Sequence, residues 1–173
     1  MPALPSMLEA TDRRVTKWMA DHAVLLMRVA LGILFIWFGF LKFFPGVSSE
    51  EDIATRTISA LSFGILQPAV SRPLLATWEC AIGIGLISGR ALRLTLLLLF
   101  VQMLGTLMPL ALFPRDCFVV FPIVPTLQGQ FIMKNLVLIA AGIFIGATVR
   151  GGTVVADPHA AMTAKHIERH GVA

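Results

Sequence analysis

Four apolar segments dominate this sequence, and each is long enough to cross a lipid bilayer. They cover residues 23–44, 73–89, 94–113 and 131–149. A membrane-spanning helix needs about 17 to 25 predominantly apolar residues. Because lipid offers backbone groups no hydrogen-bonding partners, each segment is expected to be helical. The sequence therefore predicts an all-α polytopic membrane protein, built as a bundle of four transmembrane helices.

The overall composition also indicates that a bilayer, and not water, surrounds this chain. Of its 173 residues, 57% are hydrophobic and only 14% are charged, whereas about 25% of residues are charged in a typical soluble domain. The length suits one domain. The formal net charge of +4 is small and does not indicate a nucleic-acid partner, so the lipid bilayer is the expected surrounding.

The basic residues between the segments predict the orientation of the bundle. Eight arginines and lysines, at positions 13, 14, 17, 90, 93, 150, 165 and 169, fall on one side. The three arginines on the other side, at 56, 72 and 115, are offset by four acidic residues. The positive-inside rule therefore places the N-terminal segment 1–22 and the polar tail 151–173 in the cytoplasm. Segment 1–22 is charged and lacks a compact apolar core, so it is not expected to be a cleaved signal peptide.

Two connections on the opposite, external side are expected to have structure of their own. In residues 45–72, Ser49 precedes three acidic residues, a pattern that suits the start of a helix. Apolar residues at 53, 58, 61 and 65 then form a partial stripe, which predicts a short interfacial or re-entrant helix. The apolar, proline-rich connection at 113–130 is expected to pack over the mouth of the bundle.

Small residues on the first two segments favour close packing of their helices. Gly32 and Gly39 share a predicted helix face with Lys42, and Gly83 lies one turn after Glu79. Small residues on such a face let two membrane helices approach closely.

Ionisable residues inside the apolar segments mark the candidate functional site. Lys42 lies near the external end of the first segment, Glu79 about six residues into the second, and Lys134 at the start of the fourth. A lone carboxylate at this depth is costly, and charged groups within membrane spans are candidates for function. We therefore predict that Lys42 pairs with Glu79 inside the bundle, and that Lys134 and Asn135 complete a polar cluster.

Simpler explanations remain open for these polar residues. Lys42 and Lys134 lie near helix ends, where lysine side chains often extend to the lipid headgroups. Arg28 can do the same at the cytoplasmic end, and the predicted ion pair could be purely structural. Gln102 and Thr106 in the third segment are expected to bond between helices and not to contact a ligand.

Motifs of soluble enzymes do not occur in the sequence, which has no phosphate-binding loop, metalloprotease signature or nucleophile elbow. Cys80 and Cys117 are too few and too far apart for a CxxC redox or zinc site. The depth of Cys80 also argues against a disulfide. His166 and His170 have a metal-compatible spacing but no third ligand nearby, so no metal site is predicted and the catalytic residues, if any, are not identified.

Several polar motifs follow one another in a definite order over residues 24–150. An arginine opens the first segment and Gly-x-x-Lys-Phe closes it, Glu-x-x-x-Gly lies in the second, and Gly-Gln-x-x-x-Lys-Asn precedes the fourth. This order resembles the DoxX-like family of small bacterial four-helix membrane proteins. The motif positions implied by the resemblance are Arg28, Lys42, Glu79, Gln130, Lys134 and Asn135.

The resemblance implies a bacterial cytoplasmic (inner) membrane and a link to redox chemistry. The family is named for a small subunit of a membrane thiosulfate:quinone oxidoreductase. Related members are linked to oxidative or reactive-chlorine stress, or to membrane assemblies with soluble redox proteins. The implied function is a redox-linked subunit that binds a quinone or a small oxyanion, or that anchors a soluble redox partner or a membrane complex. Whether the chain has an activity of its own stays open.

Two further functions are compatible with the sequence. A non-enzymatic structural or accessory subunit would use the charged cluster only to fix the register of its helices. A small-solute transporter would have to form a homo-oligomer, because four helices without an evident inverted repeat make a poor alternating-access machine.

Overall fold

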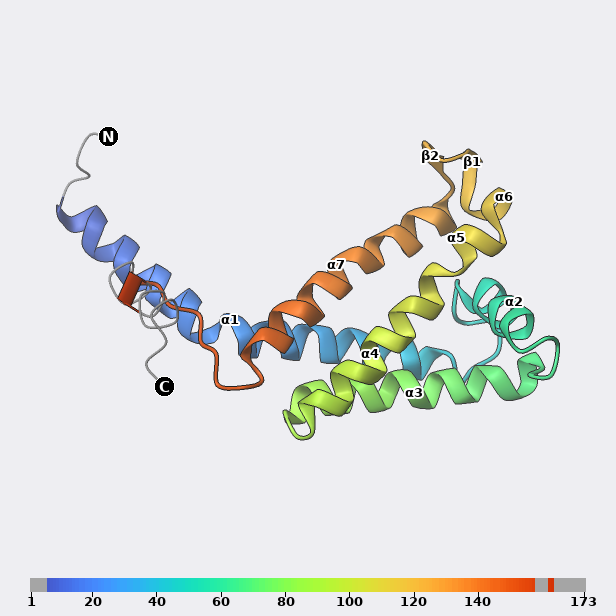
Figure 1. Cartoon of the computed structure of the whole chain (residues 1–173), viewed down its shortest axis with the longest axis horizontal. Helices are drawn as coiled ribbons and strands as arrows, with labels where there is room; N and C mark the ends of the chain where they lie inside the picture. The colour runs from blue at the N-terminus through green and yellow to red at the C-terminus, as the bar shows by residue number, and fades with distance from the viewer. Residues whose placement is uncertain (1–5, 158–161, 164–173) are drawn as a thin grey trace.

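A computed structural model describes residues 6–157 and 162–163, and it is built almost entirely from helices (Figure 1). The main elements are α1 (Ser6–Leu41), α2 (Glu51–Leu61), α3 (Pro68–Ser88), α4 (Leu92–Leu107), α5 (Pro109–Leu112), α6 (Pro114–Cys117), β1 (Phe118–Val120), β2 (Val124–Pro125) and α7 (Leu127–Thr148). The predicted all-α class is confirmed. Most of the predicted tail 151–173, with His166 and His170, lies outside the described residues.

Four helical stretches are long and apolar enough to cross a membrane, as the sequence predicts. They are Leu8–Leu41, Pro68–Ser88, Leu92–Leu112 and Leu127–Thr148. The third stretch, Leu92–Leu112, contains both α4 and α5. The missing N–H of Pro109 interrupts the helical hydrogen bonding between them.

All four long helices begin earlier than the predicted spans, and for α1, α3 and α7 the sequence supplies a local reason. α1 begins at Ser6, because neither glycine nor proline occurs in its first half. α3 begins at Pro68, because the fixed φ of proline suits the first helical position. α7 begins at Leu127, because the hydroxyl of Thr126 accepts the N–H of Gly129 at 3.2 Å and caps the helix.

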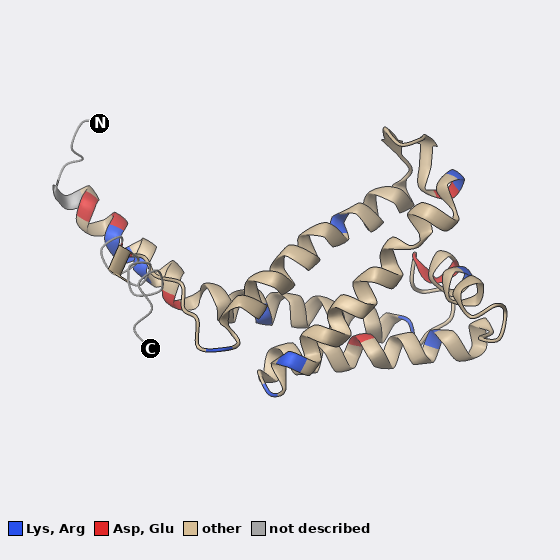
Figure 2. Cartoon of the chain, in the orientation of Figure 1, with Lys and Arg blue, Asp and Glu red and all other residues tan. Residues whose placement is uncertain are grey.

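The four long helices form two pairs that diverge like a fork (Figure 1). α1 packs mainly on α3, and α4 packs mainly on α7. The pairs approach each other near the α3–α4 turn and separate toward the opposite end, where α2, α5, α6 and the strands lie. We call this opposite end the α2 end. Apart from the N-terminal part of α1, the long helices carry few charged residues (Figure 2).

A central apolar core joins all four long helices. It contains Leu31 and Phe35 from α1, Ile82 from α3, Leu99 from α4 and Ile145 from α7. The last three of these side chains have no exposed surface. This core holds the closed part of the fork together.

A smaller apolar cluster fixes the α2 end. Ile53 of α2, Cys117 of α6 and Ile132 of α7 pack against one another, so the proline-rich connection does lie over this end of the bundle. Beyond α6 the connection forms a two-stranded antiparallel hairpin, β1–β2. The sequence analysis did not predict this hairpin, although its valine and phenylalanine residues favour strands.

Glycines let α1 and α3 approach until their backbones are in contact. A Cβ atom on Gly83 would lie 2.6 Å from the carbonyl oxygen of Gly32 and 2.9 Å from the amide nitrogen of Ile36. A Cβ atom on Gly39 would lie 2.9 Å from the Cβ of Glu79. The predicted packing of small residues is therefore present, and it brings the end of α1 next to Glu79.

Two ion pairs fasten α2 across the open end of the fork. Glu51 bonds to Arg72 of α3 at 3.0 Å, and Arg56 bonds to Asp116 of α6 at 2.9 Å. The helix begins after Glu50 and no side chain caps it, so the predicted capping role of Ser49 is wrong. The second carboxylate oxygen of Glu51 instead accepts the N–H of Gly46 at 2.7 Å, and this contact takes over the anchoring of the turn before α2.

Substitution of Gly83 by alanine is expected to destabilise the α1–α3 pair. The added methyl group meets backbone atoms that cannot move independently, and overpacking of this kind costs about 1–3 kcal/mol. Gly105→Ala is a matched control, because no atom lies within 4 Å of its Cβ position. Reversible unfolding in detergent would measure both variants. An equal effect of the two substitutions would contradict this close packing.

Acidification is expected to loosen the start of α2. The Gly46 amide and then the Arg72 guanidinium lower the pKa of Glu51 below its ordinary value. Because folding lowers this pKa, the anchor contributes stability above the ordinary glutamate pKa and loses it as the pH falls through the lowered value. Hydrogen-exchange protection factors around Gly46 should therefore drop at low pH, and in Glu51→Gln already at neutral pH. Asp52→Asn serves as the control.

Asp52 suits the control because its side chain is 75% exposed and its carboxylate lies 3.4 Å from the guanidinium of Arg56. Exposed pairs of this kind contribute little. If the hydrogen-exchange protection factors around Gly46 were the same in Glu51→Gln, in Asp52→Asn and in the wild type, the role of the Glu51–Gly46 contact in holding the start of α2 would be refuted.

Candidate functional site

The most buried charges of the described bundle form one ion pair. Lys42 lies in the turn that follows α1, and its backbone N–H bonds to the carbonyl of Gly39 at 3.1 Å. Its Nζ donates to Oε2 of Glu79 in α3 at 2.7 Å. The two residues are only 5% and 6% exposed. The contact predicted between them is present in the structure.

A third helix completes the hydrogen bonding of the carboxylate. Nε2 of Gln102 in α4 donates to Oε1 of Glu79 at 2.9 Å, and Gln102 is also buried. Gln102 does bond between helices, as expected, but the sequence analysis did not connect it with Glu79. A signal for this contact exists in the sequence, because Glu79 precedes the α3–α4 turn by about as many residues as Gln102 follows it.

Lys134 and Asn135 lie beside this cluster and do not bond to it. The Nζ of Lys134 is 4.9 Å from the ring centroid of Phe131, a cation–π arrangement, and the side chain is exposed. Both oxygens of Glu79 already accept hydrogen bonds, and α7 packs on α4 and α1 more than on α3. No bond joins Lys134 to Glu79 in the described part of the chain. Lys134 and half-buried Asn135 nevertheless line a space that Lys42 and Glu79 also border.

Arg28 and Gln130, the other motif positions, lie away from the cluster. Arg28 donates from Nε to the carbonyl of Leu86 at 3.0 Å, about 10 Å along α3 from Glu79. Its positive charge there suits the C-terminal end of α3, so Arg28 does not belong to the polar cluster. Gln130 is exposed near the start of α7 and borders neither of the cavities described next.

Two cavities meet at the ion pair. Cavity A, of about 240 Å³, lies among α2, α3, α4 and α7. Cavity B, of about 300 Å³, lies among α1, α4 and α7. Both are lined by Lys42, Glu50, Glu79, Thr106 and Asn135. The charged pair therefore forms part of the partition between two spaces in the open part of the fork.

The rest of the lining is largely apolar. Leu75, Trp78 and Val101 border cavity A, while Phe35 and Phe38 border cavity B. Apolar walls with a few convergent polar groups are typical of sites for small molecules. This arrangement can hold an apolar group while a buried ammonium, carboxylate and amide contact its polar end.

The described part of the chain offers neither a cluster of metal-binding residues nor an activated cysteine. It contains no group of three His, Cys, Asp or Glu residues that could hold a metal ion. Cys80 and Cys117 are free thiols. Burial, the larger cause, and the neighbouring Asp116 raise the pKa of Cys117, which disfavours the reactive thiolate.

Comparison with known proteins identifies the family. A family model described as DoxX matches residues 23–112, slightly more than half of the chain. The chain belongs to the DoxX family. The match covers Lys42, Glu79 and Gln102, whereas Lys134 and Asn135 lie beyond it. No curated protein and no solved structure matches this DoxX-family chain.

Removal of Lys42 is expected to destabilise the protein far more than removal of Lys134. Lys42→Met leaves the buried carboxylate of Glu79 without its counter-charge, and breaking a buried pair costs about 3–5 kcal/mol. Lys134→Met changes an exposed side chain and should stay within about 0.5 kcal/mol. Reversible unfolding in detergent micelles would measure both variants.

The double variant Lys42→Met/Glu79→Leu tests whether the loss comes from an unpaired charge. It removes both charges together, so it should recover much of the stability that Lys42→Met loses. If the two single lysine variants were equally stable, the buried pair would not be the dominant interaction at this end of the bundle.

Proposed function

We propose that this DoxX-family chain is a membrane subunit that binds a quinone head group beside the Lys42–Glu79–Gln102 cluster. One observation carries the proposal: an ion pair whose two carboxylate oxygens both accept hydrogen bonds lines two largely apolar spaces. Ionisable groups at membrane depth that line cavities are associated with ligand and proton pathways.

The chemistry of a quinone suits this surrounding. A quinone ring is flat and apolar on its faces, and its carbonyl oxygens accept hydrogen bonds. Lys42 is a donor at the border of both cavities, and Gln102 has a second N–H beyond the one that it gives to Glu79. Cavity B, at about 300 Å³, lies at the lower limit of the range for ligand sites, and cavity A, at about 240 Å³, lies just below it. These volumes favour a small quinone over a whole lipid.

Proton exchange gives the ion pair a role in such a site. Reduction of a quinone to a quinol takes two electrons and two protons. Lys42 would give each of the two protons in turn from Nζ. After each transfer the carboxylate of Glu79 would pass a replacement proton from bulk water to the neutral amine, so both protons come from water. The electrons would come from a soluble redox partner that docks on the bundle, so the chain would act in catalysis only as a subunit of an oxidoreductase assembly.

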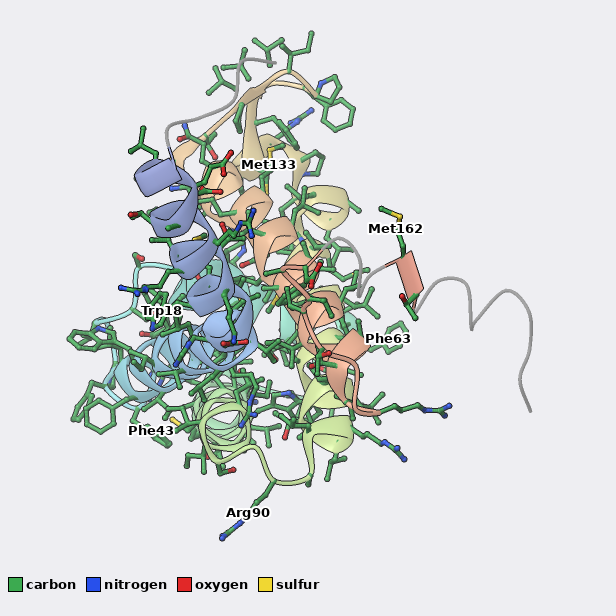
Figure 3. All side chains as sticks on the ribbon, turned by 90° about the vertical axis from the view of Figure 1, so that its left-hand side faces the viewer. Trp18, Phe43, Phe63, Arg90, Met133 and Met162 are labelled. Carbon is green, nitrogen blue, oxygen red and sulfur yellow. The ribbon has the colours of Figure 1, made fainter. Side chains whose placement is uncertain are left out.

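The proposed location is a bacterial cytoplasmic membrane with both termini inside. Arg90 lies in the α3–α4 turn and Arg93 at the start of α4, and both are exposed. Arg90 extends away from the helices (Figure 3). Basic residues of this kind favour the cytoplasmic side. The ion pair and both cavities would then lie toward the external side.

Quinone binding is expected to depend on Glu79. Glu79→Gln keeps the size of the side chain but removes the charge that holds the ammonium of Lys42 in place. Its affinity for a short-chain benzoquinone should fall at least about tenfold, which corresponds to 1.4 kcal/mol. Quinone-induced shifts in unfolding temperature would measure this. Gln130→Ala is the control, because Gln130 borders neither cavity.

Native mass spectrometry of the wild type, extracted gently from its membrane, provides an independent check. A retained quinone-mass ligand would support the proposal. Unaltered quinone affinity in a less stable Glu79→Gln variant would instead support a structural subunit, in which the ion pair only fixes helix register.

A further inference from the structure

The hydroxyl of Ser71 is buried at the wall of cavity A and has no hydrogen-bond partner among the described residues. Ser71 lies in the first turns of α3, has no exposed surface, and borders cavity A. Its Oγ is a buried polar atom to which no described group bonds. A buried hydroxyl without a partner costs about 1–3 kcal/mol, so this position calls for a group that is absent from the protein itself.

Three other hydrogen-bonding groups that line cavity A already have partners. Thr57 donates to the carbonyl of Ile53 at 2.6 Å, and Thr106 donates to the carbonyl of Met103 at 2.9 Å. The ring N–H of Trp78 donates to a backbone carbonyl of α4 at 3.2 Å. Ser71 therefore differs from the threonine hydroxyls of this cavity, each of which bonds within its own helix.

The spacing of Ser71 and Glu79 defines two polar ends of cavity A. Eight residues separate them, so they share a face of α3 and lie about 12 Å apart along its axis. Leu75 and Trp78 lie between them on the cavity wall. Glu79 with Gln102 forms one polar end, and Ser71 forms the other.

We infer that the ligand of cavity A is an amphiphile with a hydrogen-bonding group at each end. One end contacts the Lys42–Glu79–Gln102 cluster, the apolar middle lies against Leu75 and Trp78, and the far end bonds to Ser71. This inference rests on the proposed quinone site and adds a second recognition point. A quinone whose side chain ends in a hydroxyl group belongs to this class.

Two probes that differ at the far end can test the inference. One is a benzoquinone with a pentyl chain, and the other is the same quinone with a pentyl chain that ends in a hydroxyl group. The hydroxylated probe should bind the wild type roughly tenfold more tightly, the upper part of the range for one net hydrogen bond. Titration of the full-length protein in detergent, followed by unfolding temperature, would give both affinities.

Ser71→Ala should abolish the preference without weakening the protein. Loss of an unpartnered hydroxyl leaves the unfolding temperature of the ligand-free variant equal or higher, while both probes bind with the same affinity. Ser88→Ala is the control, because Ser88 lies on the same helix, is exposed, and bonds to the carbonyl of Gly85. If Ser71 had only a structural role or bonded only to water, Ser71→Ala would not lose the preference for the hydroxylated probe while keeping its unfolding temperature.

The outcomes separate the failure of this inference from that of the quinone site. If the wild type binds both probes equally, or if Ser71→Ala keeps the preference, the second recognition point is refuted and the quinone site stands. If the wild type binds neither probe, both are refuted.

Discussion

The buried ion pair between Lys42 and Glu79 is the interaction on which the open end of this bundle depends. Two charges removed from water cost several kcal/mol each, and their attraction compensates only when the geometry is good and the remaining hydrogen bonds are made. Gln102 supplies the remaining bond to the carboxylate. Gly39 allows α1 to approach the Cβ of Glu79, so the glycine packing and the ion pair depend on each other.

The divergence of the helix pairs turns this ion pair into part of a site. Where α1 and α3 separate from α4 and α7, side chains no longer fill the space, and cavities form on both sides of the cluster. α2 closes this space from outside. Its ion pairs reach α3 through Arg72 and α6 through Asp116, so the short helix bridges the two arms of the fork.

Depth within the membrane could be predicted from the sequence, whereas the direction of each side chain could not. Span limits placed Lys42, Glu79 and Lys134 at similar depth, and the first two do meet. Lys134 borders the same cavity as this pair but makes no bond to it, because the rotation of α7 about its axis depends on packing with α4. For the same reason the contact between Gln102 and Glu79 was not predicted. The two residues lie at the same depth, but the sequence did not show which way Gln102 points. The fork arises from tertiary packing, which local propensity does not encode, whereas the valine and phenylalanine residues of the hairpin do favour strands.

A purely structural role leaves the space around the ion pair unexplained. Replacement of a buried pair by apolar residues of similar volume is often neutral or stabilising, so packing alone does not require these charges. Cavity A measures about 240 Å³ and its lining is largely apolar. An occupant with an apolar body and polar ends would fill this space and also bond to the hydroxyl of Ser71, which no side chain of the described residues does.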